Sequence, residues 1–295
     1  MIIDAIKIYS AAETGISAQL FAELSLTDVD ETHKYILEDV TGLDPDQIGP
    51  VYSGGYSASG ASYYDMVCPP RNIGLRVKLN PYPGVDTYSS LREAFYKLIW
   101  KSRTSLVELR LMSEGNVVAV IKGLTVKFEA PTFTASPYIV MTFWCPYGLF
   151  QSQNYVTLDH DDIHDTLNKY IIEDESSTAP HGFKMVLEAG YDLYYVTIQG
   201  LTGYTTYPFK INREFNSGDK IYFSSEQENR YLYYCTAAAP TVKHHIADKI
   251  DANQVWPLIF PGENKFTIEA PATIEIAGDL CQIESLNHKY HYWGV

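Results

Sequence analysis

The sequence predicts a mostly β protein of two domains, and three observations carry this prediction. The chain has 295 residues, which suits two domains of about 150 residues each. Short stretches of alternating apolar and polar residues, separated by turn sequences, recur along most of the chain. Tyrosine, which strands favour, occurs 24 times against 12 phenylalanines. We expect an N-terminal β domain with one helix over residues 1–150 and a β-sandwich-like domain over residues 151–295.

The charge balance argues against a protein that binds nucleic acids. The net charge is −14, and hydrophobic residues make up 46% of the chain, which is a globular composition. Residues 1–150 hold 12 basic and 16 acidic residues, and the remainder holds 10 basic and 20 acidic ones. Binding to phosphate backbones needs a basic stripe, which neither half contains. We therefore expect no specific nucleic-acid binding.

The cysteines and the N-terminus bear on the compartment. Cys68, Cys145, Cys235 and Cys281 lie far apart beside apolar or aromatic residues, so we expect reduced core thiols. The N-terminal apolar run is too short for a signal peptide, and no stretch has the length of a membrane span. We expect a protein made in a reducing cytoplasm, without membrane insertion.

The first half contains one helical pattern among strands. Ser90 and Glu93 match a capping box, which predicts a helix start at this point. Leu91, Phe95, Leu98 and Ile99 then fall on one helical face. Residues 53–61 have the glycine–serine composition of a flexible loop. The expected strands are residues 4–9, 35–40, 72–79, 106–112, 116–128 and 138–144.

The second half contains short strands without a strong helical pattern. Their spacing by turns predicts a β-sandwich or a small barrel. Two acidic stretches, residues 159–165 and 173–177, are expected to be exposed. The expected strands are residues 184–187, 193–198, 207–211, 220–223, 231–235, 265–269, 273–276 and 280–285.

The densest group of metal-type ligands is His160, Asp161, Asp162, His164 and Asp165. These side chains could bind a divalent cation and activate water. Their spacing matches no catalytic frame, and aspartates are also favourable at the start of a helix, where the helix dipole stabilises them. We expect no metal, no cofactor and no catalytic residue, and keep this segment as the metal candidate.

Aromatic side chains offer a second candidate site. Trp256, Tyr204, Tyr207 and Trp293 could stack on a sugar, as aromatic rings do in lectin-like sandwiches. Tryptophan more often serves packing, so a buried structural role for Trp256 is the stronger interpretation.

Several short motifs resemble, in order, those of the phage distal tail protein family. Each motif is weak alone, but their number and order along nearly the whole chain make the resemblance specific. In the first half they are residues 35–43 (YILEDVTGL), 70–75 (PRNIGL), 92–100 (REAFYKLIW), 121–124 (IKGL) and 143–150 (FWCPYGLF). In the second half they are residues 209–212 (FKIN), 215–221 (FNSGDKI), 229–232 (NRYL), 256–264 (WPLIFPGEN) and 290–295 (YHYWGV). Residues 146–148 (PYG) replace the usual acidic–proline pair of that family.

The resemblance implies a non-enzymatic component of the virion tail tip. In that family the N-terminal domain forms a ring, often a hexamer, with a central channel for DNA. The ring contacts the tail tube protein on one side and the tail-associated tip protein on the other. A galectin-like or oligonucleotide-fold-like C-terminal domain lies outside and carries receptor-binding parts or a host-facing surface used in adsorption.

Two alternatives stay open at this point. One is a carbohydrate-binding, lectin-like protein that recognises the host surface through its second domain. The other is a hydrolase that uses the segment 160–165. Within the ring hypothesis, we expect the hairpin over residues 106–128 to lie at the interface between subunits.

Overall fold

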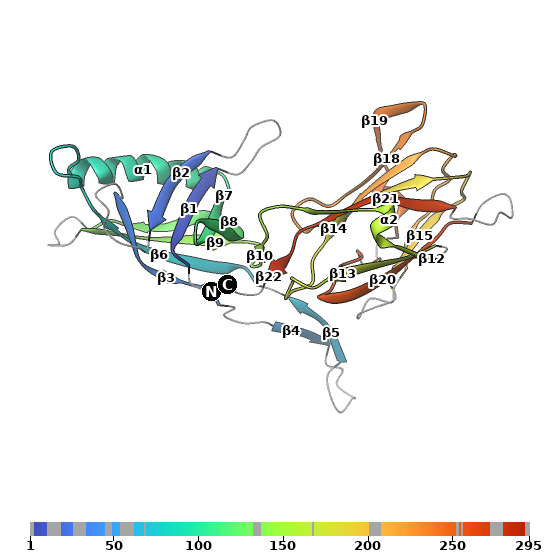
Figure 1. Ribbon diagram of the computed structural model, residues 1–295, viewed down its shortest axis with the longest axis horizontal. Coiled ribbons are helices and arrows are strands. Elements are labelled where there is room, and N and C mark those ends of the chain that lie inside the picture. The colour runs from blue at the N-terminus through green and yellow to red at the C-terminus, as the bar shows by residue number, and fades with distance from the viewer. Residues whose placement is uncertain are drawn as a thin grey trace. The chain divides into compact units, whose positions relative to one another are not determined.

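The computed structural model describes residues 3–10, 19–25, 34–44, 49–53, 62–67, 69–131, 137–166, 168–200, 208–251, 254, 256–271 and 280–292. The chain is mostly β and divides into two compact units, and Figure 1 labels most of their elements. The first unit comprises Met1–Gln153 and Tyr292–Val295, and the second comprises Asn154–His291. The first unit is therefore discontinuous in sequence, because the chain returns to it after the second unit.

A nine-stranded sheet forms most of the first unit, in the order β22-β10-β8-β7-β1-β2-β3-β6-β9. The long strand β8 also pairs with β9, so seven of these strands form a closed circuit of pairings. The strands are β1 (Ala5–Ser10), β2 (Leu20–Ser25), β3 (Tyr35–Thr41), β6 (Arg71–Leu79), β7 (Val107–Ser113), β8 (Asn116–Glu129), β9 (Tyr138–Cys145), β10 (Phe150–Gln151) and β22 (His291–Tyr292). Two further strands, β4 (Gly49–Ser53) and β5 (Ser62–Val67), pair with each other.

Alternation along β6 and β9 builds the core of this unit. Every second residue of β6 from Arg71 onward is buried, and β9 alternates in the same way. In the antiparallel register, Leu75 lies opposite Met141 and Ile73 lies opposite Phe143, all within the apolar core. The period-two pattern that predicted the strand at residues 72–79 therefore also determines which side chains face inward.

Helix α1 (Tyr88–Thr104) packs on β8 and β6. Leu91 and Phe95 insert into the core, and the Phe95 ring lies 5.0 Å from that of Tyr35. The predicted start of the helix was wrong. The capping box consists of Thr87 and Ser90: Ser90 N donates to Thr87 Oγ1 at 3.1 Å, and Thr87 N donates to Ser90 Oγ at 2.9 Å.

The second unit is a sandwich of two sheets, which Figure 1 shows as separate layers. The six-stranded sheet has the order β11-β21-β14-β17-β18-β19, and the five-stranded sheet has the order β12-β13-β20-β15-β16. The elements are β11 (Val156–Asp159), α2 (His160–Ile163), β12 (His164–Thr166), β13 (Lys169–Asp174), β14 (Phe183–Ala189), β15 (Val196–Gly200), β16 (Phe209–Ile211), β17 (Lys220–Ser224), β18 (Tyr231–Thr236), β19 (Ala239–His245), the 3₁₀ helix η1 (Ala247–Lys249), β20 (Gly262–Glu269) and β21 (Cys281–His288).

Phenylalanine rings connect the two sheets. Phe183 of the six-stranded sheet lies 5.6 Å from Phe266 of the five-stranded sheet. Phe223 and Phe209, also from opposite sheets, lie 5.2 Å apart in an edge-to-face arrangement. All four rings are buried. Aromatic pairs in this geometry contribute beyond their burial, so they hold the layers in register.

Several residues of the sequence motifs stabilise turns through side-chain hydrogen bonds. Asn264 closes the turn before β20: its Nδ2 donates to the carbonyls of Phe260 and Gly262, and its Oδ1 accepts from Phe260 N at 2.8 Å. Buried Asp219 accepts from Asn216 N at 3.0 Å and from Ala237 N at 3.3 Å. These side chains form hydrogen bonds with backbone groups of the turns and so stabilise the turn conformations.

The motifs of the first unit act similarly. Buried Arg71 donates to the carbonyl of Leu43 at 3.0 Å, and its guanidinium lies 4.8 Å from the centre of the Phe150 ring. Gly42 has φ +82°, and a Cβ there would lie 2.0 Å from Asn72 O. Gly42 therefore has to lack a side chain for β6 to approach.

Two further expectations can be compared with the structure. Cys145, Cys235 and Cys281 are buried, and no disulfide joins Cys145 or Cys235 to another described residue. Burial raises the pKa of Cys145 to about 12, so this thiol stays protonated. Residues 159–165 and 173–177 were expected to be exposed, but Ile163 of the first stretch and Asp174 and Ser177 of the second are buried. Among the described residues, none of the helices has the length and apolar character of a membrane span.

Candidate functional site

The predicted metal segment forms α2 and the start of β12. Asp159 caps α2, and Asp162 Oδ2 accepts the backbone N–H of Asp159 at 2.9 Å. The rings of His160 and His164 lie 4.7 Å apart, and both meet the buried ring of Tyr170 edge-on. The aspartates thus occupy the first turn of a short helix, where carboxylates interact favourably with exposed amides.

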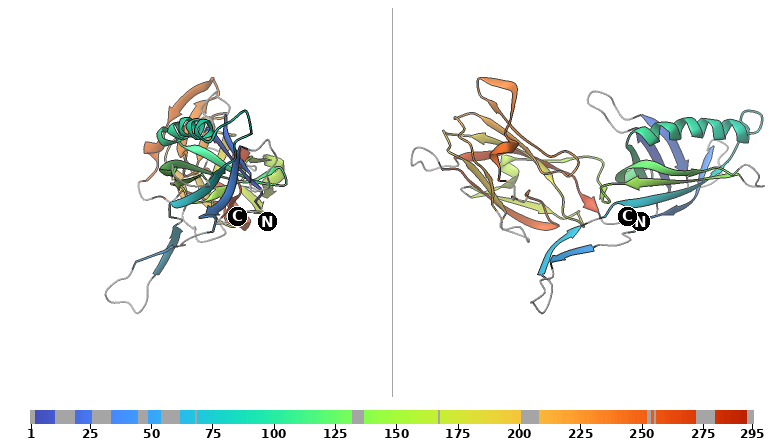
Figure 2. Two further views of the ribbon diagram at one scale, coloured as in Figure 1. Left: turned by 90° about the vertical axis from the view of Figure 1, so that its left-hand side faces the viewer. Right: turned by 180° about the vertical axis from the view of Figure 1, so that it is seen from behind.

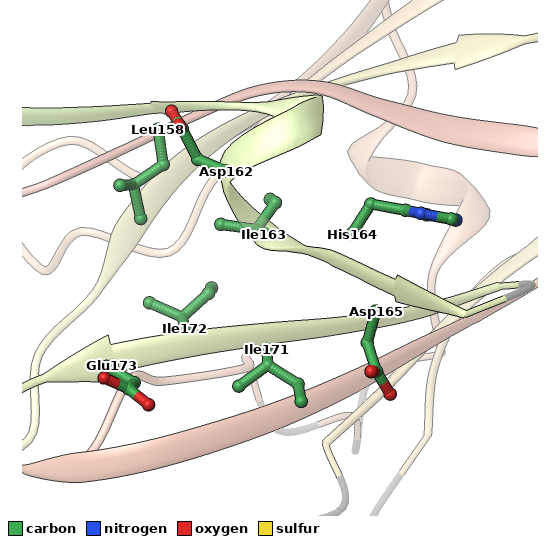
Figure 3. A pocket seen from close by; sticks show the side chains of 8 residues that line it. All are labelled: Leu158, Asp162, Ile163, His164, Asp165, Ile171, Ile172 and Glu173. Atoms are coloured by element: carbon green, nitrogen blue, oxygen red, sulfur yellow. The ribbon is translucent and has the colours of Figure 1, made fainter.

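A pocket of about 330 Å³ lies beside this segment. Four of its lining residues are the aliphatic side chains of Leu158, Ile163, Ile171 and Ile172, and the others are Asp162, His164, Asp165 and Glu173. Figure 3 shows the acidic side chains at separate edges of the pocket, without a common point toward which they converge. No three described His, Cys, Asp or Glu side chains form a group that could hold a metal ion. The metal site therefore stays a prediction, because the candidate ligands in this segment do not point toward a common position.

The structure describes one of the four predicted sugar-stacking residues. Trp256 packs against the core of the second unit, with its ring 5.0 Å from Phe209 and 5.3 Å from Phe223. Tyr204, Tyr207 and Trp293 lie outside the described residues. The described contacts of Trp256 are those of a packing residue, and sugar stacking stays a prediction.

Tyrosines gather instead on the outer face of the six-stranded sheet. Tyr222 and Tyr233 lie opposite each other on β17 and β18, and their rings stack at 4.8 Å. The ring of Tyr231 lies 5.4 Å from that of Tyr233. Nearby on the same sheet, Lys184 Nζ lies 4.1 Å above the half-exposed ring of Tyr155. This tyrosine face offers rings and charged groups together, a combination common at binding surfaces.

A cluster of buried histidines is the least expected feature of the second unit. His181 Nε2 lies 3.2 Å from His288 Nδ1, and His181 Nδ1 lies 3.3 Å from the carbonyl of Ala179 and 3.6 Å from Asp174 Oδ2. The ring of His291 lies 5.1 Å from that of His181. The contacts fit neutral imidazoles, with His288 donating to His181 and His181 donating to Ala179.

Burial sets the protonation of this histidine cluster, His181, His288 and His291. Burial lowers the pKa of His181 to about 4, while the carboxylate of Asp174 acts in the opposite direction. Burial likewise lowers the pKa of His288, again opposed by Asp174. The pKa of His291 lies well below its ordinary value because of burial and the nearby His181 and Lys289. The three rings are therefore neutral at pH 7.

One feature of the sequence predicts a buried position for a member of the histidine cluster. His288 follows Leu286 by two residues on β21, so it occupies an inward-facing position of an alternating strand. No comparable signal marked His181 or His291, because they lie outside regular alternation.

The comparisons with known proteins agree with this architecture. The chain is similar to the Dit protein of phage SPP1, described as a paradigm of the hub adsorption apparatus in phages that infect Gram-positive bacteria, with a TM-score of 0.60 and 13% identity over 97% of this chain and 99% of that chain. The chain has the fold of a phage Dit protein. The resemblance found in the sequence is thus confirmed at the level of fold.

Two further solved structures are less similar to this chain. Chains of the phage P2 baseplate in its activated conformation, with Ca and with Sr, have TM-scores of 0.46 and identities of 10% and 9%, over 100% of both chains in each case. These scores are too low to establish a shared fold. No protein-family model matches the sequence, and no curated protein matches it.

Proposed function

We propose that this chain is a non-enzymatic structural protein of the bacteriophage tail tip. In this proposal, copies form a ring, with a hexamer as the expected size, that joins the tail tube to the tip and receptor-binding apparatus and leaves a central channel for DNA. The observation that carries the proposal is the fold shared with SPP1 Dit over nearly the full length of both chains, including both units.

The charge of the chain supports a channel role. The net charge is −14, so an exposed surface of average composition repels the DNA backbone. A channel wall of this kind lets DNA pass without binding it. The chain would be made in the host cytoplasm and assembled there into the virion tail.

The hairpin formed by β7 and β8 is proposed to contribute to the ring interface. β7 pairs with β1 and β8. β8 pairs with β7 over Asn116–Gly123, with β9 over Leu124–Glu129 and with β10 at Val120, so most of the backbone edges of both strands are occupied within the unit. Contacts from this hairpin would therefore come from side chains, such as the partly exposed Glu108, Arg110 and Lys122. Charge reversal at these positions is expected to weaken ring assembly, and assembly like that of the wild type would exclude the hairpin.

Negative-stain electron microscopy combined with light-scattering mass tests the ring directly. Purified full-length protein is expected to form rings with a central hole, either alone or when mixed with tail tubes of the phage that encodes it. A protein that stays monomeric in both conditions would contradict the ring, and failure to bind the tubes would contradict the role at the tail tip.

The tyrosine face supports a second candidate function, carbohydrate binding by the outer domain. Tyr222, Tyr231 and Tyr233 present rings beside charged groups on an open sheet face, which suits stacking on sugars. A glycan screen with the full-length protein tests this function. Binding should be lost with Tyr233→Ala and kept with Tyr194→Ala, a control at another exposed tyrosine. The absence of any glycan ligand would remove this candidate.

A further inference from the structure

Helix α1 presents a row of partly exposed aromatic side chains, of which Tyr96 also packs edge-on against Phe128 at 4.8 Å. Tyr88, Tyr96 and Trp100 are separated by eight and four residues, so they lie along one row of the helix. Their exposed fractions are 50%, 46% and 68%, whereas Leu91 and Phe95 on the inner side are almost fully buried. No described strand of the first unit lies over the outer side of α1 (Figure 2). The helix is thus apolar on its inner side and aromatic on part of its outer side.

The grouping distinguishes this aromatic row from ordinary exposed residues. Single exposed apolar side chains are normal on protein surfaces. Here three large rings fall within the thirteen residues from Tyr88 to Trp100, whose twelve steps correspond to about 18 Å of helix. Tyrosine and tryptophan are also the residues most enriched at the energetic centres of protein interfaces. The aromatic row therefore has the composition of an interface anchor.

Charge indicates the kind of partner. The sequence of α1 contains four basic residues and one acidic residue, Glu93, in a chain whose net charge is −14. Glu93 is paired with Lys97 at 3.0 Å on the exposed side of the helix. The helix is thus a basic, aromatic element of an otherwise acidic protein, and it suits an acidic protein surface.

We infer that the aromatic row of α1 docks on the acidic surface of a second copy of this chain. This inference rests on the proposed function, because it names the contact that builds the ring. Packing α1 against α1 of a neighbour would bring two basic helices together, which repel each other. Packing α1 against a different, acidic surface of the neighbour is a heterologous contact, and such contacts generate closed rings when the rotation closes.

The area of the aromatic row indicates that it acts as an anchor within a larger interface. A fully buried aromatic side chain covers 150–250 Å², so three half-exposed rings present roughly 300 Å² together. A stable interface buries about 800 Å² on each partner. Neighbouring surfaces, such as the proposed β7–β8 hairpin, would supply the remainder.

The test compares self-association of full-length variants by sedimentation velocity or mass photometry. The double variant Tyr88→Ala/Trp100→Ala is expected to weaken association at least tenfold, with an unchanged circular dichroism spectrum. The matched control is Tyr191→Ala/Tyr194→Ala, which removes two exposed tyrosines of the second unit and should leave association unchanged. If wild-type assembly requires tail tubes, the same comparison is made on tubes.

Charge variants test the electrostatic part of the inference. Lys97→Glu should weaken association, and Lys243→Glu, at an exposed lysine of β19, should leave it unchanged. Association should also weaken as the salt concentration rises from 50 to 500 mM, on the order of tenfold. Wild-type assembly by both α1 variants would overturn the inference while leaving the ring intact. Failure of the wild-type protein to form rings, alone and on tubes, would instead overturn the proposed function.

Discussion

The two units differ in what their cores contain. Among the described residues, the buried polar side chains of the first unit are Ser25, Arg71 and Thr125, and arginine keeps its charge at every physiological pH. The second unit buries Asp174, His181 and His288 beside its phenylalanine core, with His291 packed against them. The first unit therefore depends mainly on apolar packing, whereas the second also depends on keeping its imidazoles neutral. The comparison predicts that the two units respond differently to mutation and to pH.

The largest expected effect comes from a cavity in the first unit. Phe95→Ala removes a ring that contacts Tyr35 and Phe128 in the core, and should lower the free energy of unfolding of the first unit by about 3–5 kcal/mol. Hydrogen exchange of peptides from each unit, measured during denaturation, separates the two responses. Tyr194→Ala, at an exposed position, should change stability by less than about 0.5 kcal/mol. Equal losses in both units would show that they do not unfold independently.

Acidification is expected to destabilise the second unit selectively. Because the pKa of His181 is lowered to about 4 in the fold, the unfolded chain binds a proton more readily below pH 6.5. The contribution of neutral His181 to the free energy of unfolding is fully present well above pH 6.5. It decreases as the pH falls toward 4. For His181 alone the loss between pH 7.5 and 5 is about 2 kcal/mol, and burial of His288 and His291 acts in the same direction.

Calorimetry of the full chain between pH 7.5 and 5 measures this difference. The transition of the second unit should move to lower temperature more than that of the first. The variant His244→Gln/His245→Gln changes exposed histidines on β19 and should leave the pH dependence as it is. Equal shifts of both transitions would contradict a role for the buried cluster.

A smaller effect is expected at the start of α1. Thr87→Ala removes the N-cap oxygen that accepts from Ser90 N, and should destabilise the first unit by about 1 kcal/mol. Ser89→Ala, at an exposed neighbouring position, provides the control for changes in helix propensity. Thermal denaturation suffices for the measurement. An effect at Ser89 as large as that at Thr87 would show that the cap contributes nothing specific.

The smallest effect is expected at the surface ion pair of α1. Lys97 and Glu93 lie 3.0 Å apart, but their side chains are 75% and 69% exposed. Solvent screens such a pair, so Lys97→Ala should change stability by no more than about 0.5 kcal/mol. Urea denaturation of the two proteins in parallel gives this value. A larger loss would show that Lys97 has a structural role in the isolated chain, separate from the association inferred for α1.

The sequence predicted the strands whose alternation is regular. The strands at residues 72–79 and 138–144 were found within one residue of their expected ends. In both strands every second side chain is buried in the core, so the apolar residues alternate regularly. The start of α1 was misplaced by three residues because Ser90 and Glu93 satisfy the usual capping pattern, whereas Thr87 pairs with a serine. β19 was not predicted, because its residues are exposed on both faces and show no alternation.

The candidate sites were harder to predict than the fold. Residues 160–165 were identified as a chemical cluster, but side-chain direction decides whether carboxylates converge, and sequence spacing does not specify it. The histidine cluster joins residues 107 positions apart, so only the pairing of β14 with β21 brings His181 and His288 together. Motif residues such as Asn264 and Arg71 were recognised without their roles, which are hydrogen bonds to turn carbonyls.

The discontinuity of the first unit has a consequence for synthesis. Its edge strand β22 pairs with β10, and Tyr292 packs on the core of that unit, yet Tyr292 follows the whole of the second unit in the sequence. The second unit is continuous from Asn154 to His291 and can fold as soon as that stretch emerges from the ribosome. The first unit is therefore completed only after the second unit has been translated. A truncated product that stops before Tyr292 would contain a finished second unit on an incomplete first one.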